Sequence, residues 1–166
     1  MRAEVVDGNL LDQDVEVIVN AWNRNIFPWW LLIPQGVSGE IKKRGGTAPF
    51  RELRDAGVLA LGAAVLTGPG TLPFRGIIHV AGIGFDWRAS ARSVQMSVAN
   101  AIAVANQHSF RSVAFPLVGA GTGGFRPPEV EQLMLDTLRG LAFDGEIRIV
   151  RYRPNSSLAA RRPTSS

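Results

Sequence analysis

The chain alternates between short apolar stretches and segments whose apolar positions repeat at helical spacing. Stretches rich in β-branched residues predict strands at residues 3–6, 15–19, 63–67, 76–81, 112–118 and 146–152. Helical spacing and terminal glycine or proline residues predict helices at 35–44, 49–56 and 90–107, and a further helix that begins at Pro127. This alternation of strands and helices predicts an α/β fold with one sheet covered on both faces.

Three unusual loops lie next to predicted strands or helix starts, at residues 20–23, 35–39 and 119–125. In α/β sheets, ligands bind in the crevice that the loops form at the carboxyl ends of the strands. We therefore expect the functional site in these loops.

Composition narrows the class of protein. The 166 residues are 46% apolar and 19% charged, which is typical of one compact domain. We expect this domain to span residues 1–154, with residues 155–166 as a flexible tail. The longest apolar run, near residues 26–33, is short and contains a proline, and charged residues open the chain. The sequence thus predicts neither a membrane span nor a signal peptide, and we expect a cytoplasmic protein with no membrane partner.

Cysteine and histidine content limits the chemistry. The sequence has no cysteine, which excludes disulfides, zinc–thiolate sites and cysteine nucleophiles. Its two histidines, His79 and His108, disfavour a histidine-built metal site, and we expect no cofactor. His79 stands in an apolar strand, which favours a structural role. The sequence lacks a G-x-S-x-G elbow and a Walker lysine, so an enzymatic activity would depend on positioning water and substrate.

Arginine supplies most of the positive charge, because Lys42 and Lys43 are the only lysines in a chain of net charge +4. The densest basic clusters are residues 42–44 and Arg151, Arg153, Arg161 and Arg162. Neither cluster forms a long basic run. We therefore favour a solvated surface over a nucleic-acid-binding patch.

Residues 119–124 (Gly-Ala-Gly-Thr-Gly-Gly) form a glycine-rich segment between a predicted strand and a helix start. Glycine lets main-chain N–H groups approach an anion, and the helix dipole favours phosphate at the same place. The loop at residues 35–39 also opens a helix, so the two loops could hold the two phosphates of one pyrophosphate. For either loop, the alternative is a tight turn that needs glycine only for steric reasons.

The same segment also matches G-x-G-x-x-G through Gly119, Gly121 and Gly124. A dinucleotide-binding unit has an acid near the end of the next strand, about 20 residues further on. Asp144 has this spacing but precedes the last strand. This position argues against a Rossmann unit.

Two asparagines, Asn20 and Asn23, follow a buried strand. An amide donates and accepts hydrogen bonds, which suits a ribose diol. For Asn20 we favour the alternative that it caps the turn after the strand, whereas Asn23 is the better ligand candidate. Trp22, Trp29 and Trp30 stack on a base, cover the site, or only pack their loop.

Five segments form a recognisable series. They are Gly8-Asn9-Leu10, Val17-Ile18-Val19-Asn20-Ala21-Trp22-Asn23, Gly36-Val37-Ser38-Gly39-Glu40-Ile41, Ile77-Ile78-His79-Val80-Ala81-Gly82, and Phe115-Pro116 through Phe125. In the same order, they resemble the G-D-I turn, the I-V-N-A-A-N strand end, the G-V-D-x-x-I loop, the I-H-T-V-G strand and the F-P-x-I-S-x-G-x-x-G-F loop of the macrodomain family, the ADP-ribose-binding α/β modules. The resemblance covers residues 4 to about 152 and implies a three-layer α/β/α sandwich with a mixed central sheet.

The resemblance also implies that the partner is ADP-ribose or an ADP-ribosylated substrate. Asn9 and Leu10 would contact adenine, Tyr152 would stack on it, and Asn23 and Phe125 would face the distal ribose. Main-chain N–H groups of the two loops would hold the diphosphate. The complete set of expected ligand-binding residues is Asn9, Leu10, Asn20, Asn23, Gly36, Val37, Ser38, Gly39, Gly119, Ala120, Gly121, Thr122, Gly123, Gly124, Phe125 and Tyr152.

The activity that the resemblance implies is hydrolysis of an ADP-ribose conjugate: an ADP-ribosylated side chain, an O-acetyl ester or a 1″-phosphate. Water would lie between the diphosphate and Asn23, Gly121 would limit movement of the distal ribose, and Glu40 or Asp86 would act as the base. One alternative is a reader that binds ADP-ribose without reaction. Another is a protein that binds RNA or poly(ADP-ribose) through its arginines.

Three positions depart from the family pattern. Asn9 replaces an adenine-binding aspartate, with Asp7 as a nearby rival for that role. Ser38 replaces the aspartate of the hydrolytic branch, and a hydroxyl cannot act as that carboxylate, which favours the reader. Gly123 replaces an aromatic residue.

Overall fold

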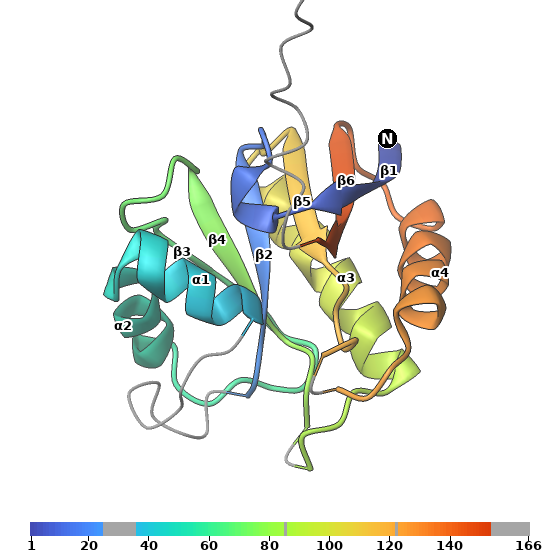
Figure 1. Ribbon diagram of the computed structural model, residues 1–166, viewed down its shortest axis with the longest axis horizontal. Coiled ribbons are helices and arrows are strands. Elements are labelled where there is room, and N and C mark those ends of the chain that lie inside the picture. The colour runs from blue at the N-terminus through green and yellow to red at the C-terminus, as the bar shows by residue number, and fades with distance from the viewer. Residues whose placement is uncertain (25–35, 85, 122, 154–166) are drawn as a thin grey trace, which may run out of the picture.

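The computed structural model describes residues 1–24, 36–84, 86–121 and 123–153. This part of the chain forms one mixed sheet with the strand order β1-β6-β5-β2-β4-β3 (Figure 1). The strands are β1 (Arg2–Gly8), β2 (Val17–Trp22), β3 (Ala64–Thr67), β4 (Gly76–Ala81), β5 (Ser112–Pro116) and β6 (Glu146–Tyr152). Neighbouring strands are parallel, except that β3 runs antiparallel to β4.

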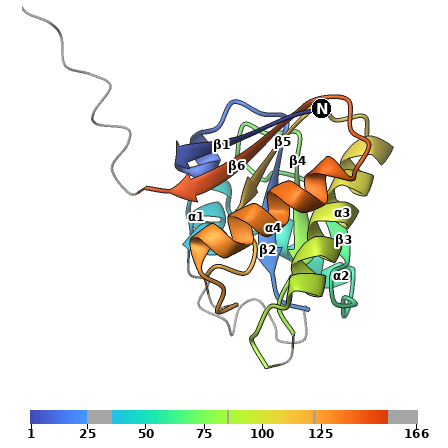
Figure 2. The same ribbon diagram turned by 90° about the vertical axis from the view of Figure 1, so that its right-hand side faces the viewer.

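Helices cover both faces of this sheet. They are α1 (Gly36–Gly45), α2 (Ala48–Asp55), α3 (Ala91–Gln107), α4 (Pro127–Arg139) and the short 3₁₀ helix η1 (Leu10–Asp12). Helices α3 and α4 pack on one face in one hydrophobic cluster, and α1, α2 and η1 pack on the other face in a second cluster (Figures 1 and 2). The expected three-layer α/β/α sandwich with a mixed central sheet is confirmed.

The side chains of β2 show how the sequence makes two cores. Val17 and Val19 point to the cluster under α3 and α4, whereas Ile18 points to the cluster under α1 and α2. Successive residues of a strand face opposite sides of the sheet, so a strand buried on both sides is apolar throughout. This explains why β2 lacks the polar–apolar alternation of a half-exposed strand.

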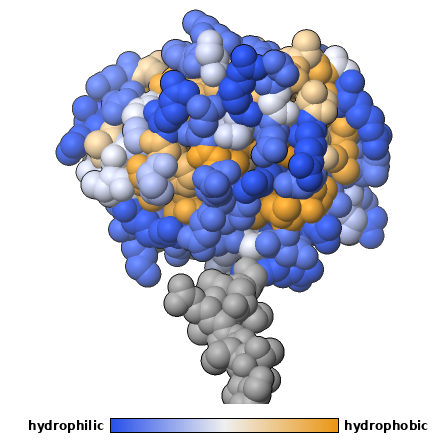
Figure 3. All heavy atoms as spheres, turned by 90° about the horizontal axis from the view of Figure 1, so that it is seen from above, coloured by the Kyte–Doolittle hydropathy of each residue, from blue (hydrophilic) through white to orange (hydrophobic). Residues whose placement is uncertain are grey.

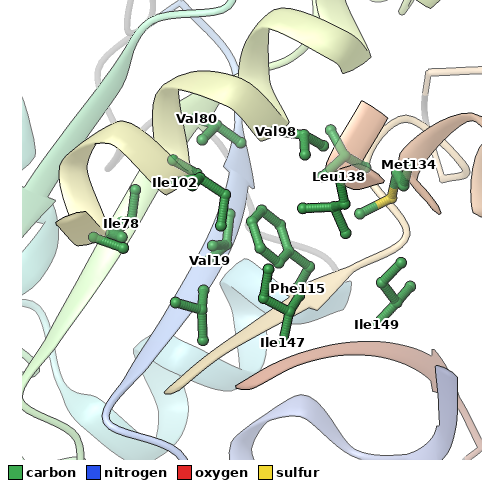
Figure 4. Packing of buried hydrophobic residues seen from close by; sticks show 14 of the residues in the cluster. Val19, Ile78, Val80, Val98, Ile102, Phe115, Met134, Leu138, Ile147 and Ile149 are labelled. Atoms are coloured by element: carbon green, nitrogen blue, oxygen red, sulfur yellow. The ribbon is translucent and has the colours of Figure 1, made fainter. Parts of the chain in front are cut away.

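Phe115 of β5 lies at the centre of the larger core (Figure 4). It is fully buried, and its neighbours in that view come from β2, β6, α3 and α4, among them Val19, Ile147, Val98 and Leu138. Burial of a phenylalanine side chain contributes roughly 1.5–3 kcal/mol. Packing across these elements holds the carboxyl ends of β2, β5 and β6 in fixed positions beside one another.

Most of the predicted elements are present, and the differences have physical causes. β5 ends at Pro116, before the predicted end at residue 118, because proline has no N–H to continue the ladder. β2 continues to Trp22, so the prediction that Asn20 caps a turn is wrong. Asn20 instead pairs in register with His79 of β4, and its side-chain nitrogen lies 3.1 Å from the imidazole of His79.

The helix η1 was not evident from the sequence. It follows β1 directly, and the side chain of Asn9 caps its start by accepting a hydrogen bond from the N–H of Leu11 at 2.9 Å. The hydrophobic surface seen in Figure 3 is divided into separate areas by hydrophilic residues. None of the described helices is both long and apolar enough to cross a membrane.

Candidate functional site

A pocket of about 970 Å³ opens at the carboxyl ends of β2, β5 and β6, between η1, the first turn of α1 and the start of α4. This is the edge of the sheet where the sequence predicted a site. The predicted residues that line the pocket are Asn9, Leu10, Gly36, Val37, Ser38, Glu40, Gly119, Ala120, Gly121, Gly123 and Tyr152. Two loops and three strand ends that are distant in the sequence thus meet around one cavity.

Six other predicted residues are not among those that line the pocket. They are Asn20, Asn23, Gly39, Asp86, Gly124 and Phe125. Asn20 is completely buried, and Asn23 follows the last residue of β2. Thr122, Trp29 and Trp30 lie outside the described residues. The ligand contacts expected for all of these residues stay predictions.

The segment that the sequence presents as a loop at Gly36 to Gly39 forms the first turn of α1. Gly36 has a φ of +59°, a conformation that glycine adopts without strain. The first four N–H groups of a helix have no partner inside the helix, and the helix dipole makes that end positive. Gly36, Val37 and Ser38 therefore bring an anion-binding helix end to the pocket.

The glycine-rich loop is held partly by its own hydrogen bonds. The N–H of Ala120 donates to the carbonyl of Leu117 at 3.2 Å, and the N–H of Phe125 donates to the carbonyl of Gly119 at 3.1 Å. These two N–H groups are thus engaged inside the loop. Among the described loop residues that line the pocket, Gly119, Gly121 and Gly123 are the better candidates for donating to a ligand.

The predicted adenine side of the pocket is built from η1 and the end of β6. Asn9 and Leu10 line it, and Tyr152 lies at the rim with 63% of its surface exposed. Arg151 and Arg153 flank that tyrosine, and the Nε atom of each lies 3.6 Å from the carboxylate of Asp7. Asp7, the rival of Asn9, is therefore engaged in ion pairs.

A row of buried polar side chains lies beneath the first turn of α1. The Ser38 hydroxyl donates to the Oδ1 atom of Asn20 at 2.8 Å, and the Nδ2 atom of Asn20 lies 3.1 Å from Nδ1 of His79. The other ring nitrogen of His79 lies 2.9 Å from the hydroxyl of Thr67. Burial lowers the pKa of His79 to about 3, so its ring is neutral near pH 7.

This row exists because its members share one face of the sheet. Asn20 and His79 point toward α1 and α2, because each lies two residues after a member of that core, Ile18 on β2 and Ile77 on β4. Thr67 of β3 faces the same side, because it pairs in register with Ile77. Phe50 of α2 covers the imidazole, with ring centres 6.0 Å apart. The structural role expected for His79 agrees with this complete burial.

Two carboxylates were candidates for the base. Glu40 is half-buried on α1, and it is the one carboxylate among the described residues that line the pocket. Asp86 is exposed in the loop after β4, where its Oδ1 atom accepts a hydrogen bond from the N–H of Arg88 at 3.2 Å. Within the described residues, no cluster of His, Asp and Glu side chains has the grouping of a metal site.

Sequence reasoning missed part of the pocket wall. The missed residues are Leu11, Ala21, Ile83, Pro116, Leu117, Pro127, Val150, Arg151 and Arg153. Most of these are apolar residues, which give no chemical signal in a sequence. Only the two arginines, one on each side of Tyr152, gave a usable signal in the sequence, which was their clustered positive charge.

Trp22 does not stack in the pocket. It is buried, and its ring lies 5.4 Å from that of Phe50 in the core under α1 and α2. The sequence left open whether Trp22 stacks on a base, covers the site or only packs, and its burial agrees with packing.

Several arginines of the basic clusters have acidic partners. Arg44 pairs with Asp12 at 2.9 Å, and Arg151 also lies 3.2 Å from Glu131. Such pairs reduce the local positive potential that nucleic acid requires. They support the interpretation of these arginines as solvated surface residues.

Comparisons with known proteins agree with this architecture. Residues 19–134 match the family described as Macro domain. The chain is 30% identical, over 162 residues, to the O-acetyl-ADP-ribose deacetylase of Klebsiella pneumoniae, an alignment that covers 93% of this chain and 85% of that protein. The fold is similar to that of the Oceanobacillus iheyensis macrodomain with ADP, at a TM-score of 0.77 and 25% identity, covering 92% of this chain and 84% of the other.

A second solved structure has the same fold. It is the Trypanosoma brucei macrodomain in complex with ADP-ribose, with a TM-score of 0.75 and 22% identity, covering 90% of this chain and 63% of the other.

Proposed function

The chain belongs to the Macro domain family, and we propose from this premise that its pocket binds ADP-ribose. The observation that carries the proposal is the meeting of two anion-binding main-chain elements in one pocket. The first turn of α1 and the glycine-rich loop both line the cavity. Two such elements suit the two phosphates of a diphosphate.

The remaining walls suit the two ends of this ligand. Asn9 and Tyr152 offer an amide and an aromatic ring for adenine at the side of η1 and β6. The distal ribose would then lie toward the end of β2, near Asn23. The two solved structures named above, one with ADP and one with ADP-ribose, support this choice of ligand.

We further propose that the protein hydrolyses an ADP-ribose conjugate, with O-acetyl-ADP-ribose as the first substrate to test. The support is the deacetylase name of a relative that aligns over most of this chain. In this reaction water attacks the acetyl carbonyl carbon, and the bond between that carbon and the ribose oxygen breaks. The products are acetate and ADP-ribose, whose ribose oxygen takes up a proton.

Glu40 is the residue that we propose as the base, because it lines the pocket from the second turn of α1. It would accept a proton from the attacking water. Asn23 would orient the distal ribose, and Gly121 would limit its movement, so that most of the rate gain would come from positioning. Asp86 is the weaker candidate, because it lies outside the pocket wall.

The test is release of ADP-ribose from O-acetyl-ADP-ribose, measured by chromatography under multiple turnover. We expect product with the wild type and at least a hundredfold slower release with Glu40→Gln, the size of effect that general acid–base catalysis gives. Asp86→Asn is the matched control and should react as the wild type does. Wild-type rates in both Glu40→Gln and Asn23→Ala would refute the mechanism.

A reader that binds ADP-ribose without reaction is the second candidate. Ser38 favours it, because serine stands where the hydrolytic branch of the resembled family has an aspartate and because its hydroxyl points to Asn20. The two functions separate in a single experiment. Incubation of the substrate for hours with stoichiometric protein gives product only from a hydrolase, whereas a reader shows tight binding and no product.

A further inference from the structure

The buried row beneath α1 is continuous from the pocket to the far strand of the sheet. Ser38, Asn20, His79 and Thr67 have exposed fractions of 7, 0, 0 and 5%, and each of the three side-chain contacts between them is 3.1 Å or shorter. The Thr67 hydroxyl also donates to the carbonyl of Gly68 at 3.0 Å. Ser38 is the one member of this row that lines the pocket.

The direction of these hydrogen bonds follows from proton counting. Thr67 has one hydroxyl proton, and its oxygen lies 3.0 Å from the Gly68 carbonyl and 2.9 Å from Nε2 of His79. When the Gly68 carbonyl takes that proton, the Thr67 oxygen accepts from Nε2–H of His79. A neutral imidazole carries one N–H, which leaves Nδ1 as an acceptor. It therefore accepts from Nδ2 of Asn20, and the Oδ1 atom of the same amide accepts the proton of Ser38.

The reverse direction is poorer. It would place the proton of His79 on Nδ1, turn the Asn20 amide over and make Thr67 donate to the imidazole. The Gly68 carbonyl would then lose the Thr67 proton. A buried or half-buried acceptor that loses its donor is costly, so the forward direction is favoured.

We propose that this buried row makes Ser38 an acceptor toward the pocket, so that its hydroxyl contacts a donor hydroxyl of the ligand and not a phosphoryl oxygen. The identity of that ligand rests on the proposed function, whereas the direction of the hydrogen bonds in the row does not. Ionised phosphoryl oxygens only accept hydrogen bonds, and the proton of Ser38 is already given to Asn20. In ADP-ribose the donors next to the diphosphate are ribose hydroxyls. The contact is assigned to the distal ribose, because Ser38 lies against Asn20 of β2 and the proposed function places that ribose toward the end of β2.

Thr67 is thereby a positioning residue, because it sets the tautomer of His79 and, through Asn20, the polarity of Ser38. The row also explains why this direction of hydrogen bonding requires a donor such as serine at residue 38. An aspartate at residue 38 would place a carboxylate against the Oδ1 atom of Asn20, with no proton between two acceptors. In this protein, Ser38→Asp would therefore require every hydrogen bond between the side chains of the row to reverse its direction.

The direction can be measured without ligand. Nitrogen-15 NMR of histidine-labelled protein at pH 7 distinguishes the two neutral tautomers, and a His108→Gln variant assigns the remaining signal to His79. We expect the Nε2–H tautomer. The Nδ1–H tautomer would overturn the proposal, whether or not the protein binds ADP-ribose.

The effect on the ligand is measured with two threonine variants and two ligands. Calorimetry gives the preference for ADP-ribose over ADP, which lacks the distal ribose. We expect Thr67→Val to reduce this preference about fivefold or more, because it leaves Nε2–H without its acceptor, and Thr67→Ser to keep it within about twofold. Ser38→Ala should reduce the preference in the same way if Thr67→Val does not fold.

An equal loss for both ligands, or no loss, would overturn the contact between Ser38 and a ligand hydroxyl. If the wild type binds neither ligand, the proposed function fails instead. The tautomer of His79 still decides the direction of the hydrogen bonds in the row.

Discussion

The main-chain N–H of Ala89 donates to the carbonyl oxygen of Gly123 at 3.1 Å. This bond joins the segment before α3 to the glycine-rich loop of the pocket. A Cβ atom on Gly123 would lie 2.5 Å from the carbonyl oxygen of Gly119 and 2.9 Å from the Cβ atom of Ala89. The loop is thus closed against its neighbours at Gly123.

The loop allows a matched pair of glycine substitutions. Gly123→Ala should lower the free energy of unfolding by about 1–3 kcal/mol, because main-chain atoms must move to admit the methyl group. Gly121→Ala should change it by less than about 0.5 kcal/mol, since a Cβ there meets no atom within 4 Å. Urea unfolding measures both values. Equal stabilities of the two variants would show that the loop does not pack as described.

Asn9 has two roles that substitution can separate. Asn9→Ala should lower the free energy of unfolding by about 1 kcal/mol, because η1 loses the side-chain cap on the N–H of Leu11. Asn9→Asp keeps an oxygen at the cap and adds charge. If Asn9 accepts from the adenine amino group, the aspartate should strengthen ADP-ribose binding about fivefold, as charge-assisted hydrogen bonds do.

The control ligand for Asn9→Asp is the hypoxanthine analogue of ADP-ribose, which lacks the amino group. Calorimetry should show no gain with this analogue. A gain of the same size with both ligands would place the amino group of adenine elsewhere.

Burial of His79 predicts a loss of stability in acid. The unfolded histidine has the ordinary pKa of 6.5, whereas burial lowers the pKa of folded His79 to about 3. Between these values the unfolded state binds more protons, so the free energy of unfolding falls as the pH decreases, with a slope of up to about 1.4 kcal/mol per pH unit. Above pH 6.5 this contribution is complete.

Urea unfolding at pH 7, 6 and 5 measures this dependence before the carboxylates titrate. Below about pH 4.5, Glu16 adds a loss of the same sign, because the N–H of Arg111 and the side chain of Arg75 lower the pKa of its carboxyl group in the folded state. Unchanged stability from pH 7 to pH 5 would contradict the burial of a neutral imidazole.

Two serines of α3 provide a test of its packing. Within the described residues, the buried hydroxyl of Ser97 has no hydrogen-bond partner, so Ser97→Ala should raise the free energy of unfolding by about 0.5–1 kcal/mol. The Ser93 hydroxyl donates to the carbonyl of Gly82 at 2.9 Å and caps the helix start with Ser90. Ser93→Ala should therefore lower it by about 1 kcal/mol. Thermal unfolding distinguishes the opposite signs.

The fold could be predicted well from the sequence because its elements have local signals. β4 and β6 have the predicted bounds, and α4 begins at Pro127 as predicted. The error at Asn20 has a non-local cause, since His79 and Ser38, both distant in the sequence, satisfy its amide inside β2. Pairing of this kind is not visible in a single segment.

The site could be predicted in part for the same reason. Glycine and a helix start are signals for phosphate wherever they occur, and both loops line the pocket. The apolar wall, for example Ile83 and Leu117, depends on which strand ends meet, and so it became evident only from the fold. Resemblance supplied the ligand, which the loops alone left open.

The central claim is that this pocket binds ADP-ribose, and calorimetric titration of the purified protein with ADP-ribose tests it most directly. AMP and NAD serve as controls. We predict binding of one ADP-ribose per chain with a dissociation constant on the order of micromolar, and weaker binding of both controls. Absence of heat at millimolar ADP-ribose would contradict the account.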